Sequence, residues 1–284
     1  MYDIFAIIGG DERMRYAGER LADMGFSVRS YAVPSAHSEE IVSCRDIKTT
    51  LDGADFILLP VPLSRDFHTL WAPAHAGEIL LNDVLLQAPK SARILGGGSL
   101  ADSRFVNYAC RDDFACENAV PTAEGALLIA MQKLSCTIRG MHVGVVGFGR
   151  VGRAVASLFR AAGAFVTVFA RRDEVCSAAS VLGYCSAPIS TLCTHAEELR
   201  CLINTVPSPV IGCDTLCVMR KDAIILELAS EPYGVDFEAA RNFGVQAVLA
   251  RGLPGKYSPE TAGNVIAATV LNVLCEEGVP LKIL

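Results

Sequence analysis

The stretch that decides the fold is HVGVVGFGRVGRAVASLFRAAGAFVTVFARRD, residues 142–173. A short apolar run over residues 143–146 leads into the glycine turn 147–152, which has the spacing GxGxxG. An amphipathic segment then predicts a helix up to Ala162, and a second apolar run over 165–169 predicts the next strand. A strand, glycine turn, helix and strand in this order are typical of a Rossmann unit that binds a dinucleotide.

The glycine turn predicts where the pyrophosphate of such a ligand lies. Gly147 permits the tight turn, Gly149 lets the pyrophosphate approach the backbone, and Gly152 lets helix and strand pack closely. The helix that begins here directs unpaired N–H groups and the positive end of its dipole at the phosphates. The cofactor-binding residues predicted at this turn are Gly147, Gly149, Arg150, Val151 and Gly152.

The end of the second strand indicates which dinucleotide binds. An NAD site usually has an Asp or Glu there, which accepts hydrogen bonds from the ribose 2′-hydroxyl. Here Ala170 is followed by Arg171 and Arg172. Guanidinium groups bind a 2′-phosphate through charge-assisted hydrogen bonds, whereas a carboxylate would repel it. We therefore predict NADP(H), held by Arg171 and Arg172. In the alternative interpretation the arginines form only a solvated strand end and Asp173 binds the ribose of NAD.

Length and composition limit the class of protein. A chain of 284 residues suits two domains, and it has no run approaching eighteen uninterrupted apolar residues. The net charge of −6 argues against nucleic acid or an anionic membrane as a partner. The eleven cysteines include no CxxC pair, so we predict no metal site and a reducing, cytoplasmic compartment. The apolar surroundings of Cys136, Cys201 and Cys275 predict small core residues.

Short apolar runs alternate with helical patterns along the rest of the chain. The further predicted strands are 4–8, 28–32, 56–60, 93–95 and 105–108 in the first part, and 202–206, 223–228 and 245–250 in the second. A helix is predicted over 13–24, after the turn Gly9-Gly10-Asp11. This alternation predicts an α/β protein with two doubly wound Rossmann-like domains, mostly parallel sheets and a cleft between the domains.

Two helices set the expected domain boundaries. One is predicted to begin at Pro121 with Thr122 as its cap, and its apolar face is predicted to contain Leu127, Leu128, Met131 and Leu134. The other begins at Ser258-Pro259, and we expect it to fold back on the first domain. The predicted domains are an N-terminal substrate or partner domain over 1–120, completed by 258–284, and an NADP-binding domain over 121–257.

Ligands of doubly wound sheets bind beyond the carboxyl ends of the strands. Further cofactor contacts are therefore predicted at Thr205, Val206, Pro207 and Ala229, which follow two strands of the second domain. Arg13 and Lys256 are suited to bind an anionic group, and Ser99 follows the glycine turn at the matching edge of the first domain. In the alternative interpretation Arg13 is a solvated helix residue, Lys256 is an exposed loop lysine and the turn before Ser99 is an ordinary surface turn.

The histidines exclude one mechanism. Hydroxyacid dehydrogenases of similar architecture use a late histidine, polarised by a carboxylate, as general acid and base. No histidine follows His195 in this chain. Alcohol–ketone interconversion by that mechanism is not expected, and no catalytic base is predicted.

Taken together, these motifs resemble the A subunit of dipicolinate synthase, and the resemblance covers nearly the whole chain. The segments that carry it are Gly9–Arg13, Pro121–Gly125, Gly147–Gly152, Ile203–Ser208, Leu228–Ser230, Gly252–Gly255 and Pro259–Gly263. The glycine turn alone is generic, but the ordered set is specific. The segment Ser64–His75 matches no family motif, which leaves pocket assignments there open.

The resemblance implies an activity and a partner. The family is associated with NADP-dependent oxidation of a dihydrodipicolinate-type precursor to dipicolinate, in the mother-cell cytoplasm of spore-forming bacteria. This step branches from the lysine and diaminopimelate pathway. Its B subunit is a flavoprotein-like partner, and the A subunit could also form a homo-oligomer. Aromatisation supplies most of the driving force, so orientation and two anion clamps for the two carboxylates are the main requirements. The resemblance thus implies Arg13, Ser99, Thr122 and Lys256 as the substrate-binding residues. Two other functions stay open: another two-domain NAD(P)-dependent amino-acid or imine dehydrogenase, and a nucleotide-binding subunit without catalytic activity.

Overall fold

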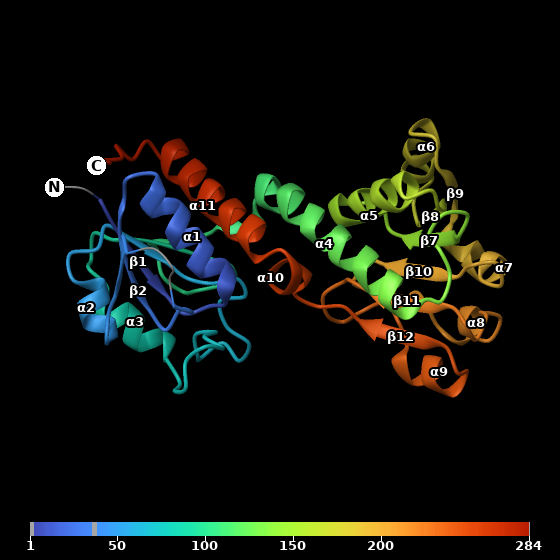
Figure 1. Ribbon diagram of the computed structural model, residues 1–284, viewed down its shortest axis with the longest axis horizontal. Helices are drawn as coiled ribbons and strands as arrows, with labels where there is room; N and C mark the ends of the chain where they lie inside the picture. Colours follow the sequence, from blue (N-terminus) through green and yellow to red (C-terminus); the bar gives the residue numbers. More distant parts are fainter. Residues whose placement is uncertain (1–2, 36–38, 284) are drawn as a thin grey trace. The chain divides into compact units, whose positions relative to one another are not determined.

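The computed structural model describes residues 3–35 and 39–283 and divides the chain into two compact units (Figure 1). The first unit comprises Met1–Asn118 and Tyr257–Leu284, and the second comprises Ala119–Lys256. Each unit contains one parallel six-stranded sheet with helices on both of its faces. The predicted class, two doubly wound Rossmann-like domains, is confirmed.

The sheet of the first unit has the strand order β3-β2-β1-β4-β5-β6. Its strands are β1 (Ile4–Ile8), β2 (Ser27–Tyr31), β3 (Ile41–Ser43), β4 (Phe56–Leu58), β5 (Arg93–Gly96) and β6 (Phe105–Asn107). The helices α1 (Glu12–Asp23) and α11 (Pro259–Glu276) cover one face, and α2 (Ile47–Leu51) and α3 (Leu81–Gln87) cover the other. Because both faces are covered, the central strand β1 is apolar along its length rather than alternating.

The helices α1 and α11 lie side by side although they come from opposite ends of the chain (Figure 1). Their shared core includes Met14 and Leu21 from α1 and Ile266 and Val270 from α11. Ser258 is the residue before α11, as predicted, but its side chain forms no capping hydrogen bond. The C-terminal helix is thus an integral layer of the first unit.

The sheet of the second unit has the order β12-β11-β10-β7-β8-β9. Its strands are β7 (His142–Val146), β8 (Phe165–Ala170), β9 (Cys185–Pro188), β10 (Cys201–Asn204), β11 (Ile224–Glu227) and β12 (Gln246–Leu249). Its helices are α5 (Arg150–Ala161), α6 (Asp173–Val181), α7 (Leu192–His195), α8 (Cys213–Leu216) and α9 (Phe237–Asn242), and α10 (Leu253–Tyr257) follows β12. The strand order reverses between β7 and β10, where a doubly wound sheet binds its ligand.

Side chains of β7 alternate between two hydrophobic layers of the second unit. Val143 and Val145 pack in the layer that contains Phe159 of α5, whereas Val146 packs in the layer that contains Leu216 of α8. All three valines are completely buried. This two-sided burial holds the glycine turn, which begins one residue after Val146, at the carboxyl edge of the sheet.

The helix predicted to begin at Pro121 begins earlier. It is α4 (Asp112–Lys133), and Pro121 lies inside it, where it cannot donate to the carbonyl of Glu117. The acidic first turn, Asp112 and Asp113, favours the earlier start because carboxylates stabilise a helix N-terminus. Thr122 is therefore not a helix cap.

The apolar face predicted for this helix was also wrong in part. Leu128 and Met131 are exposed, Met131 by 61%, whereas Leu134 is buried. The residues of α4 that pack in the core of the second unit include Ala123, Ala126, Ile129 and Ala130. Small alanines let the helix approach the sheet closely, and a search for large apolar residues overlooks them.

The cysteines do not follow the prediction of small core residues. Cys201 is buried, but Cys136 and Cys275 are exposed. Seven of the eleven cysteines are exposed, and all eleven are free thiols. The apolar neighbours of Cys136 and Cys275 in the sequence belong to helices and turns whose opposite sides face the core.

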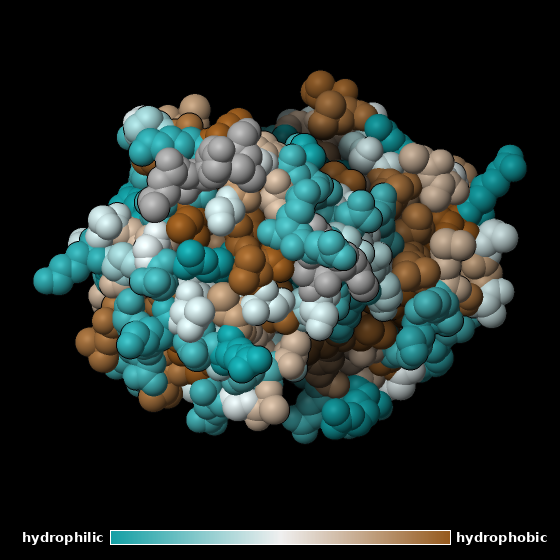
Figure 2. Space-filling model, turned by 60° about the vertical axis from the view of Figure 1, so that its left-hand side comes forward, coloured by the Kyte–Doolittle hydropathy of each residue, from teal (hydrophilic) through white to brown (hydrophobic). Residues whose placement is uncertain are grey.

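The surface mixes polar and apolar residues. On the face drawn in Figure 2, hydrophobic groups (brown) lie between hydrophilic ones (teal). Among the described residues, Phe67, Leu86 and Val181 are the most exposed large apolar side chains. No helix in the described parts of the chain has the length and apolar character needed to span a bilayer.

Candidate functional site

The glycine turn connects β7 to α5 at the carboxyl edge of the second sheet. Gly147 has a φ of +91°, and a Cβ placed there would lie 2.5 Å from Oγ1 of Thr205. A Cβ on Gly152 would lie 2.3 Å from the carbonyl oxygen of Gly147. These two glycines are therefore required by the fold of the turn itself, before any ligand is considered.

Gly149 differs from its neighbours, because a Cβ there would meet no atom within 4 Å. It is the residue before α5, and no side chain caps that helix start. The N-terminus of α5 thus lies beside empty space at Gly149, an arrangement that fits a dinucleotide pyrophosphate. Arg150 and Val151 form the first residues of α5, exposed and half-buried, respectively.

The end of β8 presents the residues predicted to select NADP. Ala170 is buried, and Arg171 is exposed and forms no hydrogen bond or ion pair with the described residues. Arg172 precedes α6 and pairs with Glu174 at 3.2 Å, with both side chains about 70% exposed. Asp173 lies in the first turn of α6. The guanidinium of Arg171 is therefore the available cation at this strand end.

The loop after β10 is tied to the glycine turn. The hydroxyl and the N–H of Thr205 both donate to the carbonyl oxygen of Val146, at 2.8 and 3.0 Å. The N–H of Val206 donates to Oδ1 of Asn204 at 3.1 Å, and Pro207 is exposed. Thr205 thus holds the loop against the end of β7 at the glycine turn, whereas the N–H of Val206 is bonded within the loop to Asn204.

Beneath this loop lies a buried polar pair that sequence reasoning missed. Glu227 at the end of β11 and Asn204 at the end of β10 are both 0% exposed. Nδ2 of Asn204 donates to both carboxylate oxygens of Glu227, at 2.7 and 2.9 Å. The N–H of Ala229, a predicted cofactor residue, also donates to this carboxylate, at 2.9 Å. A charged residue that ends an otherwise apolar strand is the signal that could have revealed the pair.

In the first unit, Arg13 lies at the carboxyl edge of the sheet, in the first turn of α1. Its Nε donates to Oδ1 of Asp11 at 2.9 Å, and its Nη2 donates to the carbonyl oxygen of Val61 at 2.6 Å. It is 9% exposed, so it is not a solvated helix residue. Nη1 forms no hydrogen bond within the described residues and is not among their buried unpaired atoms. Nη1 therefore keeps some contact with solvent, although the side chain as a whole is only 10% exposed.

Tyr108 lies in the core of the first unit, near Arg13. Tyr108 is completely buried and donates its hydroxyl hydrogen to the carbonyl oxygen of Leu59 at 3.1 Å. Burial raises the pKa of its phenol, while the nearby Arg13 lowers it and Asp11 raises it. Tyr108 therefore remains a neutral hydrogen-bond donor at physiological pH.

The segment Ser64–His75, which matches no family motif, contacts Arg13 through Trp71. The guanidinium of Arg13 lies 5.6 Å from the ring centre of Trp71, and that of Arg65 lies 5.4 Å from it. Asp66 accepts hydrogen bonds from the hydroxyl and N–H of Thr69, at 2.6 and 2.7 Å, and these bonds hold its pKa well below the usual range. The loop thus brings a second arginine near Arg13.

The four predicted substrate residues lie in different units. Arg13 and Ser99 belong to the first, whereas Thr122 and Lys256 belong to the second. Ser99 is exposed and follows Gly97, whose Cβ position is 2.3 Å from Val61, the same residue that accepts from Arg13. Arg13 and Ser99 are therefore brought to one edge. Thr122 is half-buried on α4, and Lys256 is exposed on α10.

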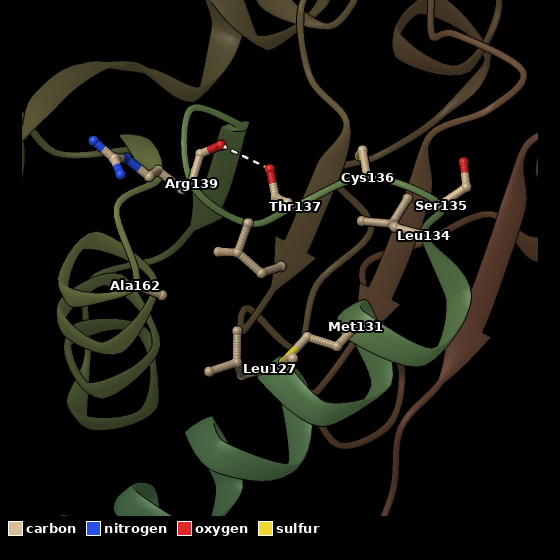
Figure 3. Close-up of a pocket in the computed structure, with 9 residues that line it drawn as sticks. Leu127, Met131, Leu134, Ser135, Cys136, Thr137, Arg139 and Ala162 are labelled. Carbon is tan, nitrogen blue, oxygen red and sulfur yellow. Dashed lines mark hydrogen bonds between the residues drawn. The ribbon is translucent and has the colours of Figure 1, made fainter.

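The second unit also has a hollow at the amino ends of its strands, opposite the edge that carries the glycine turn. It has a volume of about 610 Å³ and lies between α4, the end of α5 at Ala162 and the loop before β7 (Figure 3). Its lining includes Leu127, Met131 and Arg139, with Cys136 and Thr137 on the loop. In the described residues, no cluster of three or more His, Cys, Asp or Glu side chains could hold a metal ion.

Comparisons with known proteins agree with this geometry. Residues 4–112 match the model of the N-terminal domain of the dipicolinate synthase A subunit. The A subunit of dipicolinate synthase from Bacillus subtilis (strain 168) is 32% identical to the chain over 288 residues, which cover 95% of each protein.

The chain belongs to the family of dipicolinate synthase A subunits. The resemblance inferred from the sequence is confirmed. The crystal structure of the dipicolinate synthase A subunit from Bacillus halodurans superposes with a TM-score of 0.86 at 28% identity, over 96% of this chain and 97% of that one. The corresponding crystal structure from Bacillus subtilis superposes with a TM-score of 0.85 at 31% identity, over 97% of each chain.

The second unit has a match of its own. Residues 119–232 match the model of the NAD-binding domain of D-isomer specific 2-hydroxyacid dehydrogenases. This match supports a nicotinamide dinucleotide as the cofactor and a role as an NAD(P)-dependent oxidoreductase. The glycine turn, with the open space beside Gly149, fits that cofactor.

Proposed function

We propose that the chain is the A subunit of a dipicolinate synthase, which oxidises dihydrodipicolinate to dipicolinate with NADP+ as the oxidant. The observation that carries this proposal is its 32% identity to the dipicolinate synthase A subunit of Bacillus subtilis along 95% of both proteins. When bound, the nicotinamide supplies a hydride acceptor, and loss of a ring proton completes the aromatisation.

The choice of NADP+ rests on the end of β8. Arg171 is exposed and forms no hydrogen bond or ion pair with the described residues, so its guanidinium can bind a 2′-phosphate without first losing a partner. Arg172 pairs with Glu174 on the surface, a contact that water screens and that a phosphate could replace.

The substrate is a planar ring with two carboxylates, and it is best held by cations and hydroxyls. At the edge of the first sheet, Arg13 offers a guanidinium oriented by Asp11 and Val61, and Ser99 offers an exposed hydroxyl nearby. From the second unit, Thr122 and Lys256 are the proposed contacts. We assign them to binding and orientation, because oxidation driven by aromatisation does not require a strong general base.

The proposed biology follows the family. The chain acts with a flavoprotein-like B subunit in the mother-cell cytoplasm during sporulation, and it forms no complex with nucleic acid or membrane. A homo-oligomer is compatible with this assignment. Residues 1–120 with 258–284 form the substrate or partner domain, and residues 121–257 form the NADP-binding domain.

Single-turnover reduction of NADP+ tests the function. The purified chain is mixed with freshly generated dihydrodipicolinate, with and without the B subunit, and NADPH is followed at its absorbance maximum. We expect NADPH and dipicolinate in equal amounts. Binding of NADPH without turnover in either mixture would indicate a nucleotide-binding subunit, and turnover of an amino acid or imine instead would indicate a different dehydrogenase.

A further inference from the structure

The carboxylate of Glu227 is buried without any cation beside it. It is 0% exposed and forms no ion pair with the described residues. Its charge is compensated by four donor nitrogens, which are Nδ2 of Asn204 and the N–H groups of Ala229, Gly234 and Val235. All of these bonds are 3.0 Å or shorter. A buried charge is costly to maintain unless its hydrogen bonds are complete, and here they are complete on both oxygens.

These bonds join three parts of one sheet edge. Asn204 ends β10, Ala229 follows β11, and Gly234 and Val235 lie at the far end of the loop that follows β11. Asn204 in turn holds Val206, whose N–H donates to Oδ1 at 3.1 Å and whose carbonyl accepts from Nδ2 at 2.9 Å. The loops after β10 and β11 are therefore bound to a single carboxylate.

Packing around the pair leaves it little freedom. A Cβ on Gly234 would lie 2.3 Å from Nδ2 of Asn204 and 3.0 Å from the carbonyl oxygen of Val206. The loop backbone thus approaches the amide as closely as a glycine allows. Any side chain at position 234 would displace the amide from Glu227.

The sheet topology indicates what this edge does. The strand order reverses between β7 and β10, so a dinucleotide bound across the glycine turn would have its adenosine half on the β8 side and its nicotinamide half on the β10 side. The proposed adenine-side residue, Arg171, follows β8. Glu227 and Asn204 end the strands β11 and β10 on the other side of the reversal, where the nicotinamide half would bind.

We propose that Glu227 is a positioning residue that orders the nicotinamide half of the dinucleotide site through Asn204 and the loop 228–235. This inference rests on the proposed cofactor. In this role the buried carboxylate fixes the shape of the loops after β10 and β11, and it does not itself contact the cofactor.

Binding of whole and half ligands tests the assignment. Titration calorimetry measures the Kd of NADPH and NADH, and of the adenine-half probes ADP and adenosine 2′,5′-bisphosphate, for the wild type and for Glu227→Gln. The amide group of the introduced glutamine would direct its hydrogens at N–H donors, so the loops should lose their order. We expect Kd for the preferred dinucleotide to rise at least tenfold, while Kd for the adenine-half probes stays within twofold.

Two glycine variants supply a second test and its control, so that the inference can be tested even if Glu227→Gln does not fold. Gly234→Ala keeps the carboxylate but displaces the Asn204 amide, and it should show the same selective loss. Gly212→Ala is the matched control, because its Cβ would meet only Oδ1 of Asp214, at 3.7 Å. It should leave all affinities unchanged.

The outcomes separate this inference from the proposed function. Equal loss of whole and half ligands in Glu227→Gln and Gly234→Ala would overturn the positioning role and leave the cofactor assignment intact. Unchanged affinities in both variants would also overturn the positioning role and leave the cofactor assignment intact. Failure of the wild type to bind either dinucleotide would overturn both proposals.

Discussion

Gly263 of α11 lies directly against Arg13 of α1: a Cβ on Gly263 would be 2.5 Å from the carbonyl oxygen of Arg13. It would also be 2.6 Å from Cβ of Tyr16 and 2.9 Å from the N of Ala17. The glycine lets the C-terminal helix cross α1 at the turn that carries Arg13. The last helix of the chain is therefore packed against the candidate substrate edge of its own unit.

Gly263→Ala should lower stability although alanine normally favours a helix by about 1 kcal/mol over glycine. The new methyl meets backbone atoms that cannot move aside, so we expect a net loss of about 1–3 kcal/mol. Chemical denaturation followed by circular dichroism measures it. Asn264→Ala, at the exposed neighbouring position of α11, is the control and should be neutral or slightly stabilising. A Gly263→Ala protein as stable as the control would contradict the close crossing.

Local patterns predicted much of this molecule. The alternation of apolar runs and the glycine turn placed β7, α5 and β8 within one or two residues of their ends, because each depends on neighbours in the sequence. The start of α4 was missed because proline at position 121 is commoner at a helix start, and the acidic first turn at Asp112 was overlooked. The strand β3 was missed because it is short and lies at the sheet edge.

The candidate site was less predictable than the fold. Glu227 and Asn204 are 23 residues apart, and their contact exists only because β10 and β11 pair in register. Arg13 was identified as an anion-binding candidate, but its partner Val61 follows a different strand, 48 residues away. Such partners follow from the order of strands in the sheet, which the spacing of residues along the sequence does not specify.

Gly149→Ala and Gly152→Ala should fail in different ways. A Cβ on Gly149 meets no atom within 4 Å, so the variant should keep its Tm but bind NADPH at least tenfold more weakly, because the methyl occupies the space beside the turn. A Cβ on Gly152 would clash with the carbonyl of Gly147 at 2.3 Å, so that variant should lose stability without any ligand. Thermal melts and NADPH fluorescence titrations measure both. Unchanged NADPH affinity in Gly149→Ala would place the pyrophosphate elsewhere.

Arg111 should stabilise the first unit in a pH-dependent way. Its guanidinium bonds Asp113 at 2.9 Å and Glu276 of α11 at 2.7 Å, and it holds the pKa of Asp113 at about 2 and lowers the pKa of Glu276. Because these pKa values are lowered in the folded state, the stabilisation is present above about pH 4 and is lost as the pH falls toward 2.

Arg111→Gln should therefore lower Tm by a small amount, on the order of 2 °C, at pH 5–8, since the groups are largely solvated. The difference from the wild type should disappear between pH 4 and pH 2. Arg20→Gln on α1, where the arginine is exposed and has no ion pair in the described residues, is the control and should show no pH-dependent difference. A deficit in Arg111→Gln that persists at pH 2 would exclude the carboxylates as its cause.

Arg171→Ala should weaken NADPH binding at least tenfold, about 1.4 kcal/mol, and leave NADH binding nearly unchanged. Arg172→Ala should have a smaller effect, because that guanidinium already pairs with Glu174. Titration calorimetry with both dinucleotides compares the three proteins. A wild type that binds NADH as tightly as NADPH would overturn the proposed preference and favour Asp173 as the ribose ligand.

Arg13→Ala should lower kcat/KM for dihydrodipicolinate by about a hundredfold, or about 2.7 kcal/mol, without altering NADPH affinity. The substitution also leaves Asp11 and the carbonyl of Val61 without their shared partner, so Tm should fall, and the kinetics must be measured well below it. Arg13→Lys keeps the charge but loses the fork that bonds both groups, and it should recover only part of the activity. Arg20→Ala on the same helix is the control for a change of net charge. If Arg13→Ala kept the wild-type kcat/KM while losing stability, Arg13 would serve only to hold the sheet edge together, and the substrate carboxylate would bind elsewhere.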